Sequence, residues 1–270
     1  MKYNTIQFEK KDYIALITMN RPESLNALSK TLCNELLDAI KQCKWDSEVR
    51  AVVLTGAGKA FCAGGDVRAM KNFLHDYPDN DPGEIIEEMV SDFHPIILAL
   101  RELKKPVIGA INGICSGGGA GLAQACDILI AAESAKFHMA YIAIGEVPDG
   151  GNTFFLLHKV GIHKAAELIF TGDIINAKEA YRLGIFNRVV SDENLLSEAT
   201  KFAKRLVEKP SFAMGLAKEM LNKAFLGNLE TQLEIEKKGV ISCAGTKEFK
   251  EGITAFFEKR KPNFININLR

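Results

Sequence analysis

Short apolar runs, some alternating with polar residues, recur along the first half of the chain. Residues 3–9 and 12–19 are rich in β-branched and aromatic types and flank a polar turn, which predicts a hairpin or meander. The runs 50–56, 106–112 and 126–132 are continuously apolar, as is typical of strands covered on both faces. Helices separate these strands, so we expect right-handed βα crossovers in an α/β fold.

Helical periodicity begins after Ser29, a good cap residue. The apolar positions that follow at helical spacing are Leu32, Leu36, Ile40 and Cys43. Beyond residue 151 the chain is mainly helical in pattern. The helices predicted there are 151–170, 176–183, 192–208, 210–226, 229–243 and 246–259.

The last of these helices carries an apolar stripe on a charged background. Its members are Phe249, Ile253, Phe256 and Phe257. Two interpretations stay open: the stripe packs on the chain's own core, or it contacts another subunit.

The segment 71–83 combines Pro, Asp and Asn and is predicted to be a mobile surface loop. Pro95 either kinks the helix that follows this loop or starts a new one.

Length and charge narrow the class of protein. A chain of 270 residues forms one large α/β domain or a domain with an appendage. Its 34 basic and 34 acidic side chains cancel, and no basic block stands out. Nucleic acid and membrane surfaces are therefore poor candidate partners.

The cysteines indicate a reducing compartment. None of the 6 cysteines forms a C-x-x-C pair, and each lies in an apolar or helical context, as reduced core thiols do. The N-terminus is polar, and no apolar run is long enough to span a bilayer. We expect a cytoplasmic protein. No group of His, Cys or carboxylates has metal-ligand spacing, so no metal is predicted.

Glycines crowd the turn at 117–121, between a predicted strand and a predicted helix. A P-loop is excluded at 55–61, where Ala60 follows the lysine in place of Ser or Thr. A dinucleotide fingerprint starting at Gly117 would need glycine at Leu122. What is left is a helix N-terminus with free N–H groups near Gly118, which stabilises negative charge.

A second small-residue turn lies at 59–67, again between a strand and a helix. Gly64 and Gly65 let a ligand approach the backbone closely, and Asp66 can cap the helix that follows. The N–H groups of two such turns, on neighbouring parallel strands, can both donate to one carbonyl oxygen and so form an oxyanion hole. The alternative is that these glycines serve only tight packing.

Five segments together resemble the crotonase, or enoyl-CoA hydratase/isomerase, superfamily. They are SLNALS (24–29), AFCAGGDV (60–67), the stretch 105–132 centred on CSGGGAGLAQACD, IGEVPDGG (144–151) and FKEGITAFFEKRKPNF (249–264). The resemblance implies a crotonase-like spiral of ββα units over 1–200. It also implies a helical region, 201–270, that builds a homotrimer or hexamer and completes the coenzyme A site.

The resemblance further implies an acyl-CoA thioester substrate and no separate cofactor. By family position the oxyanion hole is formed by the backbone N–H groups of Gly65 and Gly118. Ala63, Gly64, Asp66 and Gly117 are the neighbouring residues expected to bind substrate. The region of Ala27 is expected to hold the adenine and pantetheine of coenzyme A. Lys259 either reaches the phosphates of coenzyme A or is a solvated helix end.

The reaction depends on the acids of the acyl pocket. The family's best-known hydratases have two glutamates at the positions of Gly121 and Tyr141, and neither residue here is a base at neutral pH. Asp149 matches the single carboxylate of the family's double-bond isomerases; otherwise it is a helix N-cap. Glu146 is either a second acid or a surface charge. Tyr141 either donates a hydrogen bond in the pocket or is a half-buried aromatic.

These residues favour an isomerase that shifts a 3-enoyl-CoA double bond to C2 through a dienolate, with Asp149 as acid and base. Hydration of a 2-enoyl-CoA is the alternative within the enzyme class. A crotonase homologue that binds acyl-CoA without catalysis is the third possibility.

Overall fold

The computed structural model describes residues 3–225, 227–265 and 267. Its described part contains two sheets. The larger has the order β1 (Ile6–Lys11), β2 (Ile14–Met19), β3 (Ala51–Gly56), β5 (Val107–Ile111), β7 (Ile128–Ala132) and β10 (Arg188–Val190). The smaller has the order β4 (Ala60–Cys62), β6 (Ile114–Ser116), β8 (Lys136–His138) and β9 (Ile174–Asn176).

The chain visits the two sheets alternately. After the antiparallel β1–β2 hairpin, β3, β5 and β7 pair in parallel in the larger sheet. Each is followed by a short strand of the smaller sheet, β4, β6 or β8, which also pair in parallel. A helix follows each strand pair, so the expected ββα repeat and the predicted apolar strands are confirmed.

The helices bound the sheets and form the C-terminal part. They are α1 (Lys30–Trp45), α2 (Val67–Asp76), α3 (Gly83–Glu102), α4 (Gly118–Ala125), α5 (Asn152–Thr171), α6 (Ala177–Arg182), α7 (Leu195–Val207), α8 (Ser211–Ala224), α9 (Leu229–Ala244) and α10 (Lys247–Phe257). Short 3-10 helices lie at Pro22–Ser24, Ile142–Ile144 and Asp192–Asn194. Residue 226, the predicted end of helix 210–226, lies outside the described residues.

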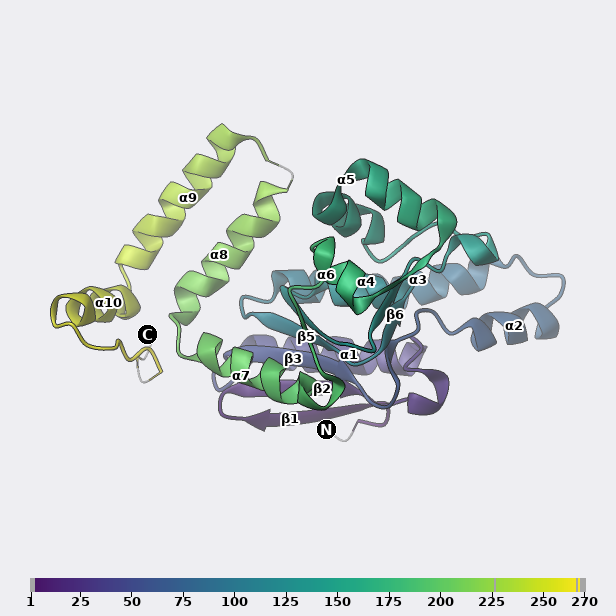
Figure 1. Cartoon of the computed structure of the whole chain (residues 1–270), viewed down its shortest axis with the longest axis horizontal. Coiled ribbons are helices and arrows are strands. Elements are labelled where there is room, and N and C mark those ends of the chain that lie inside the picture. Colours follow the sequence, from purple (N-terminus) through teal and green to yellow (C-terminus); the bar gives the residue numbers. More distant parts are fainter. Residues whose placement is uncertain (1–2, 226, 266, 268–270) are drawn as a thin grey trace.

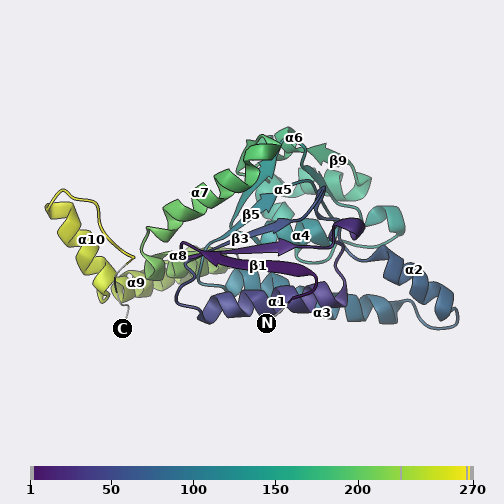
Figure 2. The same cartoon turned by 90° about the horizontal axis from the view of Figure 1, so that it is seen from below.

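Helices cover both faces of the larger sheet, as its continuous apolar strands predicted. Figure 2 shows α1 and α3 along one face and α7 along the other. Ile40 of α1 and Leu100 of α3 are buried in the main core. Val53 and Ile108 face a second cluster, completed by Ala203 of α7.

The structure tests the predictions for the segment 71–83 and for Pro95. The segment 71–83 is not all loop, because α2 continues to Asp76 and α3 begins at Gly83. Asp66 caps α2, its carboxylate accepting the N–H of Ala69 at 3.3 Å, and this cap stabilises a helix that the later polar residues obscure. Pro95 lies inside α3, so it does not start a new helix.

The described cysteines are free thiols, as predicted. Cys243 is half-buried, and the rest are buried. Burial raises the pKa of Cys33 and of Cys62 to about 12, so these thiols are unreactive. Across the described residues, no helix is both long and apolar enough to cross a bilayer.

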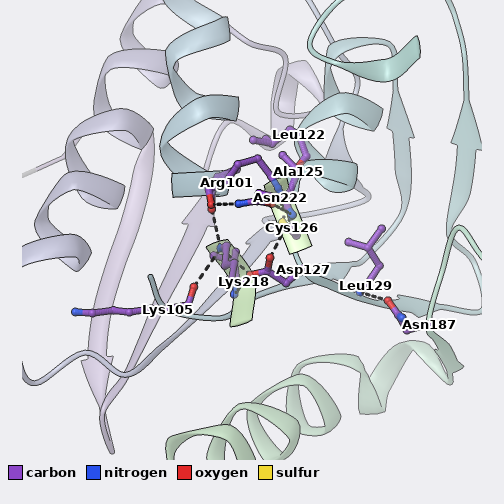
Figure 3. Close-up of polar contacts among 12 residues, drawn as sticks. Arg101, Lys105, Leu122, Ala125, Cys126, Asp127, Leu129, Asn187, Lys218 and Asn222 are labelled. Atoms are coloured by element: carbon purple, nitrogen blue, oxygen red, sulfur yellow. Dashed lines mark hydrogen bonds and ion pairs between the residues drawn. The ribbon is translucent and has the colours of Figure 1, made fainter. Parts of the chain in front are cut away.

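A buried lysine anchors α8 to the core. Figure 3 shows Lys218 surrounded by acceptors from α3 and from the segments beside β5 and β7. Its ammonium group donates to the Leu100 carbonyl and to Asp127 Oδ2, both at 2.7 Å, and to the Lys105 carbonyl at 3.2 Å. Burial lowers the pKa of Lys218, and Asp127 opposes that change.

The last helices extend away from the sheets. Figures 1 and 2 show α9 and α10 at one end of the molecule, beyond α8. Phe256 and Phe257 of the predicted stripe are 76% and 77% exposed, so they do not pack on the chain's own core.

Candidate active site

Two glycine turns meet where β4 and β6 end. A Cβ added to Gly64, which has φ +100°, would lie 2.8 Å from the Ser116 carbonyl oxygen and 3.3 Å from the Gly118 nitrogen. Gly117, with φ +51°, faces it across the same gap. The close approach of the two backbones therefore requires glycine at position 64.

Backbone hydrogen bonds fix both turns. The Leu28 N–H donates to the Gly64 carbonyl at 2.8 Å, and the Gly117 N–H donates to the His138 carbonyl at 3.0 Å. Gly118 is the first residue of α4, where N–H groups have no acceptor within the helix. Both Gly65 and Gly118 line the adjoining cavity, so the arrangement can stabilise a negatively charged oxygen.

The cavity has a volume of about 340 Å³ and mostly apolar walls. Most of the residues that the sequence singled out line this cavity. These are Ala63, Gly64, Gly65, Gly117, Gly118, Tyr141, Glu146 and Asp149. Other lining residues come from α2 and α3 and include Met70, Ile86, Met89, Val90 and Phe93.

Three predicted binding residues lie outside these walls. Asp66 caps α2 and forms an ion pair with Arg21 at 3.3 Å. Ala27 precedes the lining residue Leu28, and its carbonyl accepts from Arg21 Nη1 at 2.6 Å. Lys259 follows α10 and is exposed, and it does not line the cavity of its own chain.

Asp149 precedes α5 and is partly buried. Its Oδ1 accepts a hydrogen bond from the Tyr141 hydroxyl at 2.5 Å, and its Oδ2 lies 3.8 Å from His94 Nε2. The N-cap of α5 is Gly151, with no side-chain cap hydrogen bond. The interpretation of Asp149 as the cap of this helix is therefore wrong, and its carboxylate faces the cavity.

Tyr141 connects Asp149 to a buried amide. The Asn152 side-chain amide donates to the Tyr141 hydroxyl at 2.9 Å, and Gln124 Nε2 donates to Asn152 Oδ1 at 2.8 Å. Burial, followed by the charge of Asp149, raises the pKa of Tyr141 well above its ordinary value of 10.0. Tyr141 is therefore a hydrogen-bond donor in this site and cannot act as a base.

Glu146 is a second carboxylate at the cavity wall. Burial, and then repulsion from Asp149, raises the pKa of Glu146 above its ordinary value of 4.5. His138 contacts the Ser116 hydroxyl at 3.0 Å and does not line the cavity. Among the described residues, no three His, Cys, Asp or Glu gather in a cluster that could hold a metal ion.

Sequence reasoning missed three polar residues of this region. His94 and Asn152 contact the Asp149 segment, and Arg21 holds the Ala27 loop. Asn152 follows directly after the Asp-Gly-Gly turn, which was a usable signal. His94 gives no such signal, because 55 positions separate it from Asp149 in the chain and only the fold brings them together.

Known proteins resemble the chain over nearly its whole length. The family model for enoyl-CoA hydratase/isomerase matches residues 9–266. Crotonyl-CoA hydratase of Syntrophomonas wolfei is 38% identical over 98% of this chain and 100% of its own length. The 1,2-epoxyphenylacetyl-CoA isomerase of Escherichia coli is 38% identical over 93% of this chain and 94% of its own.

A solved structure agrees in fold. The enoyl-CoA hydratase of Bacillus anthracis superimposes with a TM-score of 0.89 at 35% identity, covering 97% of this chain and 99% of that one. The expected crotonase-like fold is thereby confirmed. The chain is an enzyme of the crotonase superfamily and belongs to its enoyl-CoA hydratase/isomerase family.

Proposed function

We propose that this enzyme is an enoyl-CoA isomerase that moves a double bond from C3 to C2 of an acyl-CoA thioester. The observation that carries the proposal is the position of Asp149, a carboxylate in the same cavity wall as the Gly65 and Gly118 amides. The two positions at which the best-known hydratases of the family carry glutamates hold Gly121 and Tyr141 instead.

The reaction requires one base and one anion site. The Asp149 carboxylate removes a proton from C2 of the 3-enoyl-CoA, and the C–H electron pair becomes part of a dienolate. The Gly65 and Gly118 N–H groups stabilise the resulting charge on the thioester oxygen. The protonated Asp149 then returns a proton to C4, which leaves the double bond between C2 and C3. Each amide contributes about 2.7–4 kcal/mol to transition-state stabilisation.

The rest of the substrate lies along the two glycine turns. The thioester oxygen reaches the Gly65 and Gly118 amides from the cavity that both residues line, and the loop at Ala27 holds the adenine and pantetheine. Lys259, which is exposed in the single chain, binds coenzyme A phosphates at a neighbouring subunit. The region 201–270 forms the contacts of a homotrimer or a hexamer, as the exposed Phe256 and Phe257 suggest. The reduced thiols fit a cytoplasmic enzyme.

The test replaces the proposed base. Asp149→Asn keeps the shape of the side chain and removes its basicity, so isomerase kcat should fall by about 10²- to 10⁴-fold. The assay follows conversion of a 3-enoyl-CoA by mass spectrometry and NMR. The exposed Asp173→Asn serves as the control and should keep wild-type turnover. Near-wild-type turnover in a folded Asp149→Asn protein would refute the proposal.

Hydration of a 2-enoyl-CoA is the second candidate, favoured by Glu146. Its carboxylate lines the same cavity as Asp149, and its raised pKa suits a proton donor. Formation of 3-hydroxyacyl-CoA that is lost in Glu146→Gln would support hydration. The named relatives are enzymes, which favours catalysis over binding alone.

A further inference from the structure

A buried polar chain connects the oxyanion helix to Asp149. It runs from Gln124 of α4 to Asn152 of α5, then to the Tyr141 hydroxyl and to Asp149 Oδ1, with heavy-atom distances of 2.8, 2.9 and 2.5 Å. Gln124 and Asn152 are 2% and 0% exposed, and Tyr141 is 7% exposed. Polar groups as buried as these are costly unless they are paired, and among the side-chain polar atoms of these three residues Gln124 Oε1 has no partner.

The surroundings of Asn152 fix the direction of every hydrogen bond. Besides Tyr141, Asn152 Nδ2 lies 3.0 Å from the carbonyl oxygens of Gly117 and Asp149. The flipped amide would direct its oxygen at both carbonyls, which also only accept. Asn152 therefore donates to the Tyr141 hydroxyl, and the hydroxyl proton points to Asp149.

This direction makes the two oxygens of Asp149 different. Oδ1 accepts the Tyr141 proton, which matches an ionised carboxylate. Oδ2 has His94 Nε2 at 3.8 Å, beyond hydrogen-bond distance, and that nitrogen already accepts the Gly150 N–H at 3.2 Å. Oδ2 is accordingly the oxygen available for proton transfer.

Asn152 also connects the carboxylate to the other half of the site. The Gly117 carbonyl that accepts from it belongs to the residue directly before Gly118, the proposed anion donor. One side chain thus holds the Asp149 backbone, the Tyr141 hydroxyl and the turn at Gly117.

The chain of polar groups occupies space that a hydratase glutamate would need. A Cβ at Gly121 would lie 2.7 Å from the Gly150 carbonyl oxygen and 3.2 Å from Asn152 Nδ2. A side chain at position 121 would therefore collide with the Gly150 backbone and crowd the Asn152 amide. Tyr141 occupies the other glutamate position. Where a hydratase of the family has two glutamates, this site therefore has Tyr141 and Asn152, which contact one acid, Asp149.

We propose that Tyr141 and Asn152 are positioning residues, which orient Asp149 so that Oδ2 takes and returns the proton at a fixed place relative to the Gly118 amide. The inference rests on the proposed function of Asp149. Neither residue exchanges a proton with the substrate.

Tyr141→Phe tests this inference because it removes one oxygen and keeps the ring in the wall. We expect kcat on a 3-enoyl-CoA to fall by roughly 10- to 100-fold, the scale of a small misplacement of a catalytic group. KM should stay within about twofold, because substrate contacts are preserved. The exposed Tyr181→Phe, on α6, is the matched control and should not change kcat.

The double variant separates positioning from a structural effect. In an Asp149→Asn background, where the proposed base is absent, Tyr141→Phe should cause no further loss of the residual rate. An equal loss in both backgrounds, or a single variant with wild-type kcat, would overturn the inference. Wild-type turnover by Asp149→Asn alone would instead refute the proposed function.

Discussion

At the scale of single residues, the site depends on glycines, which have no side chain, as much as on the residues that carry functional groups. Gly64 and Gly117 let two turns approach until their backbones touch, and Gly121 leaves room for Asn152. A Cβ at position 64 or 121 would lie 2.8 or 2.7 Å from a backbone oxygen, and the positive φ of Gly117 favours glycine there. Asp149 is the carboxylate that we propose as the acid and base, and Glu146 is a second carboxylate that lines the same cavity.

Glu146 carries a prediction about pH. Its pKa is raised in the folded protein, so the native state binds the proton more tightly than the unfolded chain. The bound proton therefore stabilises the folded protein below the ordinary pKa of a glutamate. This contribution to the free energy of unfolding is lost as pH rises through the pKa of Glu146 in the folded state. Glu146→Gln should therefore raise the melting temperature at pH 7, with no gain at pH 4.

Thermal unfolding across this pH range checks the prediction, with the exposed Glu9→Gln as control. A Glu146→Gln protein whose melting temperature at pH 7 is lower than that of the wild type would contradict it.

At the scale of elements, the anchoring of α8 depends on one buried cation. Lys218→Met removes the ammonium group and leaves the Leu100 and Lys105 carbonyls without their donor. Asp127 keeps Arg101 at 3.1 Å, which limits the cost. We expect a loss of about 3 kcal/mol in the free energy of unfolding, measured by urea denaturation. Lys223→Met, on the exposed side of α8, should cost less than about 1 kcal/mol.

The strands and helices were predictable from sequence where local periodicity decided them. The apolar runs 106–112 and 126–132 became β5 and β7, and the stripe after Ser29 became α1. The helix expected after Asp66 was predicted too short: residues 71–83 were assigned to a loop, whereas α2, which has no buried residue, continues to Asp76.

The site was predictable only in part. Glycine turns and the Asp-Gly-Gly motif are local features that sequence shows directly. The hydrogen bonds of Asn152 to Gly117 and Tyr141 join distant segments, and only the folded chain brings those segments together. The same holds for Lys218 and its three acceptors.

At the scale of the whole molecule, the C-terminal helices present an apolar surface without a partner in the single chain. Phe256 and Phe257 of α10 are both largely exposed, and Leu229 and Val240 of α9 are each 69% exposed. Exposed apolar side chains of this kind are typical of association surfaces, which supports the proposed assembly through region 201–270.

Phe257→Asp should therefore convert the proposed homotrimer to smaller species, because a carboxylate cannot be buried in an apolar contact without a partner. Light scattering coupled to size-exclusion chromatography measures the change. Ser197→Asp, which adds the same charge at an exposed position of α7 outside this region, is the control. An unchanged mass for Phe257→Asp would place the contact elsewhere.

The central claim is that one carboxylate moves a double bond. Its most direct test incubates the enzyme in deuterated water with a 3-enoyl-CoA and, separately, with a 2-enoyl-CoA, and identifies the products by mass spectrometry and NMR. We predict that the 3-enoyl thioester is converted to the 2-enoyl thioester without addition of water to the acyl chain. This conversion should be lost in Asp149→Asn. Accumulation of 3-hydroxyacyl-CoA from the 2-enoyl substrate, with no double-bond migration from the 3-enoyl substrate, would contradict this account.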